Sequence, residues 1–123
     1  MDTTLQLPLT HAELVRENIP SNIVCNNLAL FYSIFADSTR LKIIIALLLS
    51  EMCVNDIASI LSINQTTVSH QLKVLKSCGA VSCTRKNKFI FYRVNNKFIN
   101  NIMINGVDFI LKKQAWKKPR QDT

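Results

Sequence analysis

The chain has 123 residues, 48% of them hydrophobic, which suits a single domain whose core is small enough to benefit from a partner subunit. Its most apolar run, residues 41–49, is too short to cross a bilayer, and residues 1–20 lack the apolar block of a signal peptide, so we expect a cytoplasmic protein without membrane contacts. The net charge of +7 is uneven: residues 1–60 carry three basic and six acidic side chains, and residues 61–123 carry twelve basic and two acidic ones. Such a basic half favours a polyanionic partner, above all nucleic acid.

The N-terminus predicts a helical arm. Thr10 and Glu13 have the spacing of a capping box, in which each side chain satisfies a backbone N–H group at the start of a helix. The helix is therefore expected to begin near His11 and to continue until Pro20 interrupts it.

Two packing helices are expected next. Ser21 or Asn22 can cap the first, which extends to about Ala36. Residues 37–39 supply capping side chains for the second, residues 40–50, which we expect to be the most deeply buried helix of the chain. Its crowded apolar positions are Ile43, Ile44, Ile45, Leu47 and Leu48.

Residues 54–77 predict a helix-turn-helix. A first helix over residues 54–62 packs through Ile57, Ile60 and Leu61, and residues 62–64 form the turn. Asn64 can cap a second helix that extends to Ser77. Its buried stripe is Val68, Leu72 and Leu75. The opposite, polar face can meet base edges and phosphates in a major groove, and it consists of Thr66, Ser69, His70, Lys73 and Ser77.

A basic β-hairpin is expected to follow this helix. Gly79 is placed to end the helix, and residues 80–84 and 89–94 alternate as two strands do. The four residues between them, 85–88, include three cations. This hairpin is expected to act as a wing that lies against the sugar-phosphate backbone.

The last helix is expected over residues 95–113, with an apolar stripe and with Gly106 in its interior. That stripe and the helix from residue 21 offer more apolar surface than so small a core consumes, so we expect a two-fold homodimer. The organisation is then an N-terminal arm (1–20), a winged helix-turn-helix domain (21–113) and a basic flexible tail (114–123). The fold class is mainly α with a small β-hairpin.

Three segments in order resemble the ArsR/SmtB family of bacterial repressors: Ala36-Asp-Ser-Thr-Arg-Leu41, Glu51-Met-Cys-Val-Asn-Asp-Ile-Ala58 and Thr67-Val-Ser-His-Gln-Leu-Lys-Val-Leu75. The resemblance covers residues 28–111. It implies a homodimeric transcriptional repressor that binds double-stranded operator DNA and leaves it when a metal ion, metalloid or oxidant arrives. It also implies base contacts by Gln65, Thr66, Ser69 and His70, and phosphate contacts by Lys73, Arg85, Lys86 and Lys88.

The resemblance implies two kinds of inducer site. The zinc and cobalt site of the family's last helix is absent, because its positions here hold Asn96, Phe98, Phe109 and Lys112. The cysteine site that takes cadmium, lead or arsenite is partly retained. Its remaining candidate ligands for those ions or zinc are Cys53 and Asp56, joined by His11 from the N-terminal arm of the other protomer. Cys25, at the start of the next helix, is the candidate fourth ligand.

Other interpretations remain open. Each candidate ligand also fits an ordinary role, with Cys53 as a small buried residue and Asp56 as a charge at a helix N-terminus. Cys78 and Cys83 flank the reversal between helix and wing, so thiol oxidation is a second way to disturb DNA binding. A repressor without an inducer and a winged helix used for protein contacts are further alternatives. An enzyme is not expected, since no phosphate-binding glycine loop or nucleophile motif is present.

Overall fold

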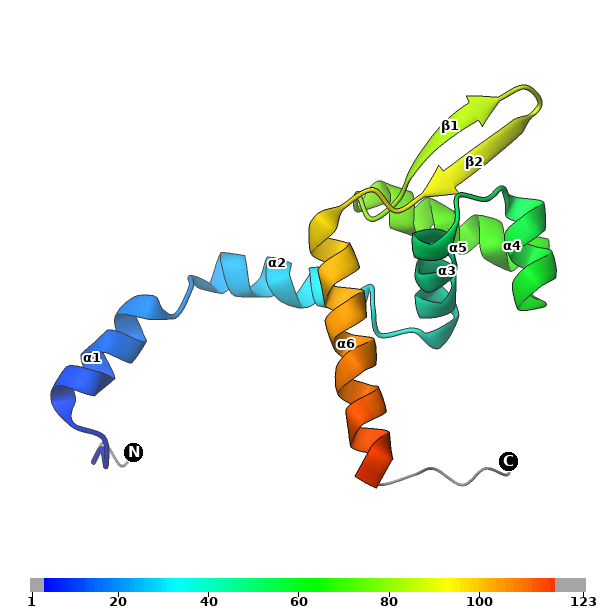
Figure 1. Ribbon diagram of the computed structural model, residues 1–123. Helices are drawn as coiled ribbons and strands as arrows, with labels where there is room; N and C mark the ends of the chain where they lie inside the picture. The colour runs from blue at the N-terminus through cyan, green and yellow to red at the C-terminus, as the bar shows by residue number, and fades with distance from the viewer. Residues whose placement is uncertain (1–3, 117–123) are drawn as a thin grey trace. The chain divides into compact units, whose positions relative to one another are not determined.

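The computed structural model describes residues 4–116 (Figure 1). The chain divides into two separate units, residues 1–34 and residues 35–123. In chain order, the described elements are α1 (Leu9–Asn18), α2 (Asn22–Ser33), α3 (Ser38–Leu49), α4 (Val54–Leu61), α5 (Gln65–Ser77), β1 (Ser82–Lys86), β2 (Phe89–Arg93) and α6 (Lys97–Trp116). The mainly helical fold with one hairpin is therefore as the sequence predicts. Residues 117–123 of the expected basic tail lie outside the described residues.

The first unit consists of α1 and α2. The predicted capping box is wrong, because Pro8 is the N-cap of α1 and Thr10 lies inside the helix. Proline suits this position because the backbone N–H of an N-cap residue would have no partner inside the helix. Ser21 caps α2 as expected, its hydroxyl oxygen accepting a hydrogen bond from the Val24 N–H at 3.3 Å. The α2 helix ends at Ser33, earlier than expected, and exposes its apolar residues.

The α3 helix supplies the centre of the second unit's core. The Asp37 carboxylate accepts a hydrogen bond from the Arg40 N–H at 3.2 Å and so caps the helix. Ile43, Ile44 and Leu47 are buried, as predicted, whereas Ile45 is 36% exposed. A helix surrounded on only part of its circumference buries one stripe, so a run of consecutive apolar residues cannot all face the core.

The helix-turn-helix forms as predicted. Ser62 takes the left-handed backbone conformation with φ 55° and ends α4. The Asn64 side chain then accepts hydrogen bonds from the N–H groups of Thr66 and Thr67 at 2.7 and 3.4 Å, which fixes the start of α5. The expected burial of Ile60 is wrong, since it is 66% exposed on the outer face of α4. The stripe of α5 is fully buried at Val68, Leu72 and Leu75.

The hairpin is tighter than the sequence predicts, and its first strand begins two residues later, at Ser82 instead of Ala80. Gly79 has φ +82°, a conformation that glycine adopts without strain, and it turns the chain after α5. Arg85 and Lys86, expected in the loop, instead lie in β1 and pair with Ile90 and Phe89 of β2. The tip is reduced to two residues, 87 and 88. Asn87 permits this turn with φ 59°, since asparagine tolerates the left-handed region.

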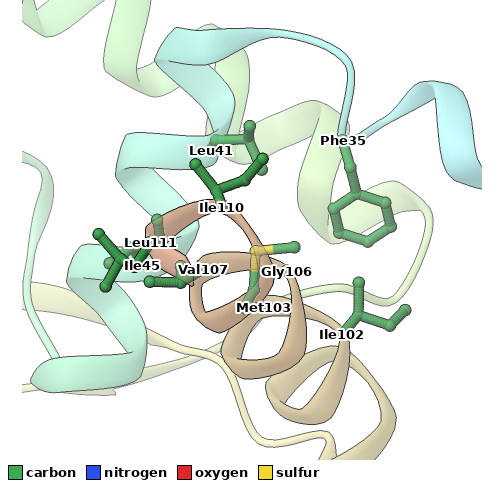
Figure 2. A pocket seen from close by; sticks show the side chains of 9 residues that line it. All are labelled: Phe35, Leu41, Ile45, Ile102, Met103, Gly106, Val107, Ile110 and Leu111. Atoms are coloured by element: carbon green, nitrogen blue, oxygen red, sulfur yellow. The ribbon is translucent and has the colours of Figure 1, made fainter. Parts of the chain in front are cut away.

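The α6 helix leaves an open apolar groove on the second unit. Ile99 and Met103 are buried, but Ile110 and Leu111 are 51% and 59% exposed. The groove has a volume of about 400 Å³, and its side chains are hydrocarbon except for one sulfur (Figure 2). Its lining comprises Phe35, Leu41, Ile45, Ile102, Met103, Gly106, Val107, Ile110 and Leu111. A side-chain carbon added at Gly106 would meet nothing within 4 Å.

The base of the hairpin is attached to the segment before α4. The backbones of Met52 and Tyr92 exchange two hydrogen bonds, at 2.8 and 3.1 Å, in an isolated antiparallel bridge. Next to this bridge, the Glu51 carboxylate lies 3.0 Å from the Lys86 ammonium and 3.5 Å from the Arg93 guanidinium. The hydrogen bond from Lys86 is the main cause that holds the pKa of Glu51 below its ordinary value of 4.5.

The two cations beside Glu51, Lys86 and Arg93, predict how the pKa of its carboxyl group responds to substitution. Replacing Lys86→Met removes the larger influence, so the pKa of Glu51 should rise towards 4.5, as read from the carboxyl carbon in a ¹³C NMR titration. Because the folded-state pKa is lowered, the stabilisation from Glu51 is present above pH 4.5 and is lost as the pH falls through the folded-state value. Lys88→Met removes an equal charge from the tip and should leave this pKa unchanged. An unchanged pKa in Lys86→Met would contradict the assignment.

Candidate DNA-binding surface and cysteine sites

The exposed face of α5 is polar along its whole length. With the stripe of Val68, Leu72 and Leu75 buried, the opposite side chains must face solvent. All five residues predicted to contact DNA from this helix are exposed, namely Gln65, Thr66, Ser69, His70 and Lys73. They offer hydroxyl, amide, imidazole and ammonium groups, which are the donors and acceptors that read base edges and bind phosphates. The Asn64 cap fixes the residue at which the helix, and with it this face, begins.

One side chain that holds α5 in place was missed by the sequence reasoning. The Arg40 Nε atom, at the start of α3, donates a hydrogen bond to the Gln71 Oε1 atom at 2.7 Å. Gln71 is half-buried beside the exposed face of α5. The bond therefore links the core helix to the helix that carries the polar face. Its two residues are 31 positions apart, so no local pattern could have indicated it.

The wing carries its cations on different faces. Arg85 and Lys86 are neighbours in β1, and successive strand residues point to opposite sides. Lys86 lies on the side of Glu51, with its ammonium 5.3 Å from the centre of the Phe91 ring. Arg85 lies on the other side and Lys88 at the tip, and both are exposed. The wing thus presents Arg85 and Lys88 to solvent directly, whereas Lys86 has an acidic partner.

Cys53 and Asp56 lie together at the N-terminus of α4. The Cys53 thiol donates a hydrogen bond to the Asp56 Oδ2 atom at 3.4 Å. Sulfur and oxygen ligands held about 2.3 and 2.1 Å from one tetrahedral ion lie roughly 3.6 Å apart. These two atoms therefore fit two of the four positions around a soft or borderline metal ion. In the described part of the chain, no three His, Cys, Asp or Glu side chains gather where they could hold a metal.

The other two predicted ligands belong to the first unit. His11 is exposed on α1, and Cys25 lies on α2, where its thiol donates a hydrogen bond to the Pro20 carbonyl at 3.6 Å. The sequence assigns them to the metal site as contributions from the other protomer, and that assignment stays a prediction.

Cys78 and Cys83 are separate free thiols. Cys78 is exposed at the end of α5, and its Sγ atom lies 3.3 Å from the Leu75 carbonyl oxygen. Cys83 is half-buried in β1, opposite Tyr92. Their proposed oxidation remains a prediction.

The positions that resemble the family's zinc and cobalt site have other roles here. The Asn96 side chain caps α6, accepting a hydrogen bond from the Ile99 N–H at 3.1 Å. Lys112 forms an ion pair with Asp108 at 3.0 Å, and Phe98 and Phe109 are exposed. Capping and ion pairing therefore use the polar side chains at these positions.

Within residues 4–116, no helix is long and apolar enough to span a membrane.

Comparisons with known proteins agree with this surface. The model of the family described as "Bacterial regulatory protein, arsR family" matches residues 37–82. A transcriptional repressor SmtB homolog of Synechocystis is 33% identical over 98 residues, which are 77% of this chain and 74% of that protein. The cadmium resistance transcriptional regulatory protein CadC of Listeria innocua is 41% identical over 80 residues, 64% of this chain and 67% of that protein.

A solved structure confirms the fold. The homodimeric winged helix-turn-helix DNA-binding domain from Mycobacterium bovis superimposes with a TM-score of 0.65 at 22% identity, covering 85% of this chain and 98% of that one. The polar face of α5, the wing beside it and the sequence relatives lead to one conclusion. The chain belongs to the ArsR family and is a DNA-binding transcriptional repressor with a winged helix-turn-helix fold, not an enzyme.

Proposed function

We propose that this repressor is a homodimer that binds its operator through α5 and the wing, and that a soft metal ion or metalloid acting at Cys53 releases it. The observation that carries the proposal is the uniformly polar face of α5, whose buried stripe leaves it no other orientation. A helix that binds another protein would more often expose aromatic or aliphatic anchors there. This argues against the protein-interaction alternative.

The contacts divide by chemistry. Gln65, Thr66, Ser69 and His70 lie near the start of α5, the end of a recognition helix that reaches base edges in the major groove. Lys73 lies one turn further along, where an ammonium can bind phosphate. Arg85 and Lys88 bind the DNA backbone from the wing. Lys86 binds it as well when it leaves its ion pair with Glu51.

The apolar groove supports the homodimer. It combines exposed aliphatic side chains of α6 with Gly106, where an added side-chain carbon would meet no atom of the described residues within 4 Å. Glycine inside a helix costs about 1 kcal/mol relative to alanine, so close approach of a second protomer is a reason for its presence. Two recognition helices then read two half-sites. The winged helix-turn-helix domain from Mycobacterium bovis, which shares the fold, is homodimeric.

The inducer site rests on Cys53 and Asp56. Their separation of 3.4 Å suits two ligands of one ion, and thiolate with carboxylate favours a soft or borderline metal. The name of the Listeria innocua relative points to cadmium, and lead, zinc and arsenite share this ligand chemistry. His11 and Cys25 of a second protomer are the proposed further ligands. Because Cys53 directly precedes α4, a metal bound there would act on the first helix of the helix-turn-helix.

The base contacts predict the effect of His70→Ala. Loss of one base-reading side chain should weaken operator binding by about 1 to 3 kcal/mol and affect a random duplex less. Fluorescence anisotropy on DNA from upstream of the protein's own gene, against random DNA of equal length, measures both. Lys73→Met is the comparison, with equal losses on the two duplexes. Equal losses for His70→Ala would mean that the imidazole binds phosphate.

The groove predicts the effect of a charge placed inside it. Ile110→Glu should convert the dimer to a monomer, seen by analytical ultracentrifugation, and should lower operator affinity about a hundredfold because the second half-site is lost. Ile60→Glu places the same charge on α4, at a side chain that is also exposed, and should remain dimeric. A dimeric Ile110→Glu protein, or a monomeric wild type, would show that the groove is not the interface.

The metal site predicts the effect of Cys53→Ser. This variant should bind operator as the wild type does but stay bound when stoichiometric cadmium is added, because its thiolate ligand is gone. Cys78→Ser should still be released. Continued release of Cys53→Ser by cadmium would end the proposal for this site. Release by diamide that Cys78→Ser abolishes would instead support oxidation at the turn before the wing.

A further inference from the structure

Glu51 is an acidic group placed among the cations of the wing. Its two carboxylate oxygens lie 3.0 Å from the Lys86 Nζ atom and 3.5 Å from the Arg93 Nη1 atom. We propose that Glu51 competes with DNA phosphate for Lys86, and so restrains the affinity of the repressor for DNA of any sequence. This inference rests on the proposed contact between the wing and the DNA backbone.

The ion pair is exposed enough to exchange. The side chains of Lys86 and Glu51 are 56% and 32% exposed, and ion pairs this exposed contribute little to stability because water competes for both charges. A phosphate oxygen offers the ammonium the same chemistry as the carboxylate. Lys86 can therefore leave Glu51 for phosphate by rotation of its side chain, without a change in the backbone.

Glu51 is not needed to hold the wing in position. The two hydrogen bonds between Met52 and Tyr92 already fix the base of the hairpin, and the strands are paired from Ser82 to Lys86. The Arg93 guanidinium has a second partner in the Thr84 hydroxyl, at 3.2 Å. Removal of the carboxylate therefore changes the charge of this face and leaves its backbone attachments.

The competition has a signature in the salt dependence of binding. Each phosphate neutralised by a free cation releases counterions from DNA and adds about 0.9 to the slope of log K against log salt. A lysine that first leaves a carboxylate adds little, because that carboxylate then attracts a cation of its own. After the exchange, Glu51 also repels the nearby phosphate. Both effects change the electrostatic interaction with the DNA phosphates, which every sequence shares, so they apply equally to operator and random DNA.

The test is Glu51→Gln in the full-length protein, bound to a random duplex two to three helical turns long over a range of salt concentrations. Affinity should rise about three- to fivefold, and the salt slope should steepen by about one. Glu17→Gln is the matched control, since it makes the same substitution at an exposed site on α1. It should change neither quantity to this extent.

Lys86→Met completes a double-mutant cycle with Glu51→Gln. It should have little effect in the wild type and should reverse both changes in the Glu51→Gln background. A Glu51→Gln protein whose affinity falls, or that matches Glu17→Gln, would overturn the competition. Arg85→Met tests the wing contact separately from the competition by Glu51, because it removes a wing cation that has no part in the Glu51 pair. If it lowers the salt slope while Glu51→Gln does nothing, the competition is wrong and the wing contact stands. If neither variant matters, both are wrong.

Discussion

The burial of three side chains on α5 is the constraint on which the rest of the molecule depends. Val68, Leu72 and Leu75 must leave water together, and this fixes the rotation of α5 about its own axis. The polar face is then directed outward without any further device. The cap at Asn64 sets where the helix begins, and the bond between Arg40 and Gln71 ties the helix to α3. The outward orientation of the polar face is thus a consequence of how α5 packs.

Local patterns were sufficient to predict the elements that are proposed to contact DNA. The α5 helix has its cap, its buried stripe and the terminating Gly79 within sixteen consecutive residues, and each appears in the structure as expected. The same holds for the cap at Asp37. In these segments the propensities of neighbouring residues agree with the tertiary packing, so short-range reasoning is reliable.

The differences between the sequence-based expectations and the structure have three physical causes. Ile45 and Ile60 are apolar but exposed, because burial depends on which neighbours surround a helix and the sequence does not state them. The pairs of Glu51 with Lys86 and of Arg40 with Gln71 join residues 35 and 31 positions apart, beyond the reach of any periodic pattern. The hairpin was misread for a local reason. Asn87 was counted as one of four loop residues, although its tolerance of positive φ allows a two-residue turn.

The bridge between Met52 and Tyr92 divides the wing into two mechanically different halves. Near Arg93 the hairpin is held on one side by its partner strand and on the other by the segment before α4. Asn87 and Lys88 lie at the end of the hairpin away from this bridge, and Figure 1 shows this end projecting beyond the helices. A two-stranded ribbon anchored at one end bends most at the other. The wing therefore has a fixed base, which preserves its alignment with α5, and a tip with more freedom to bend.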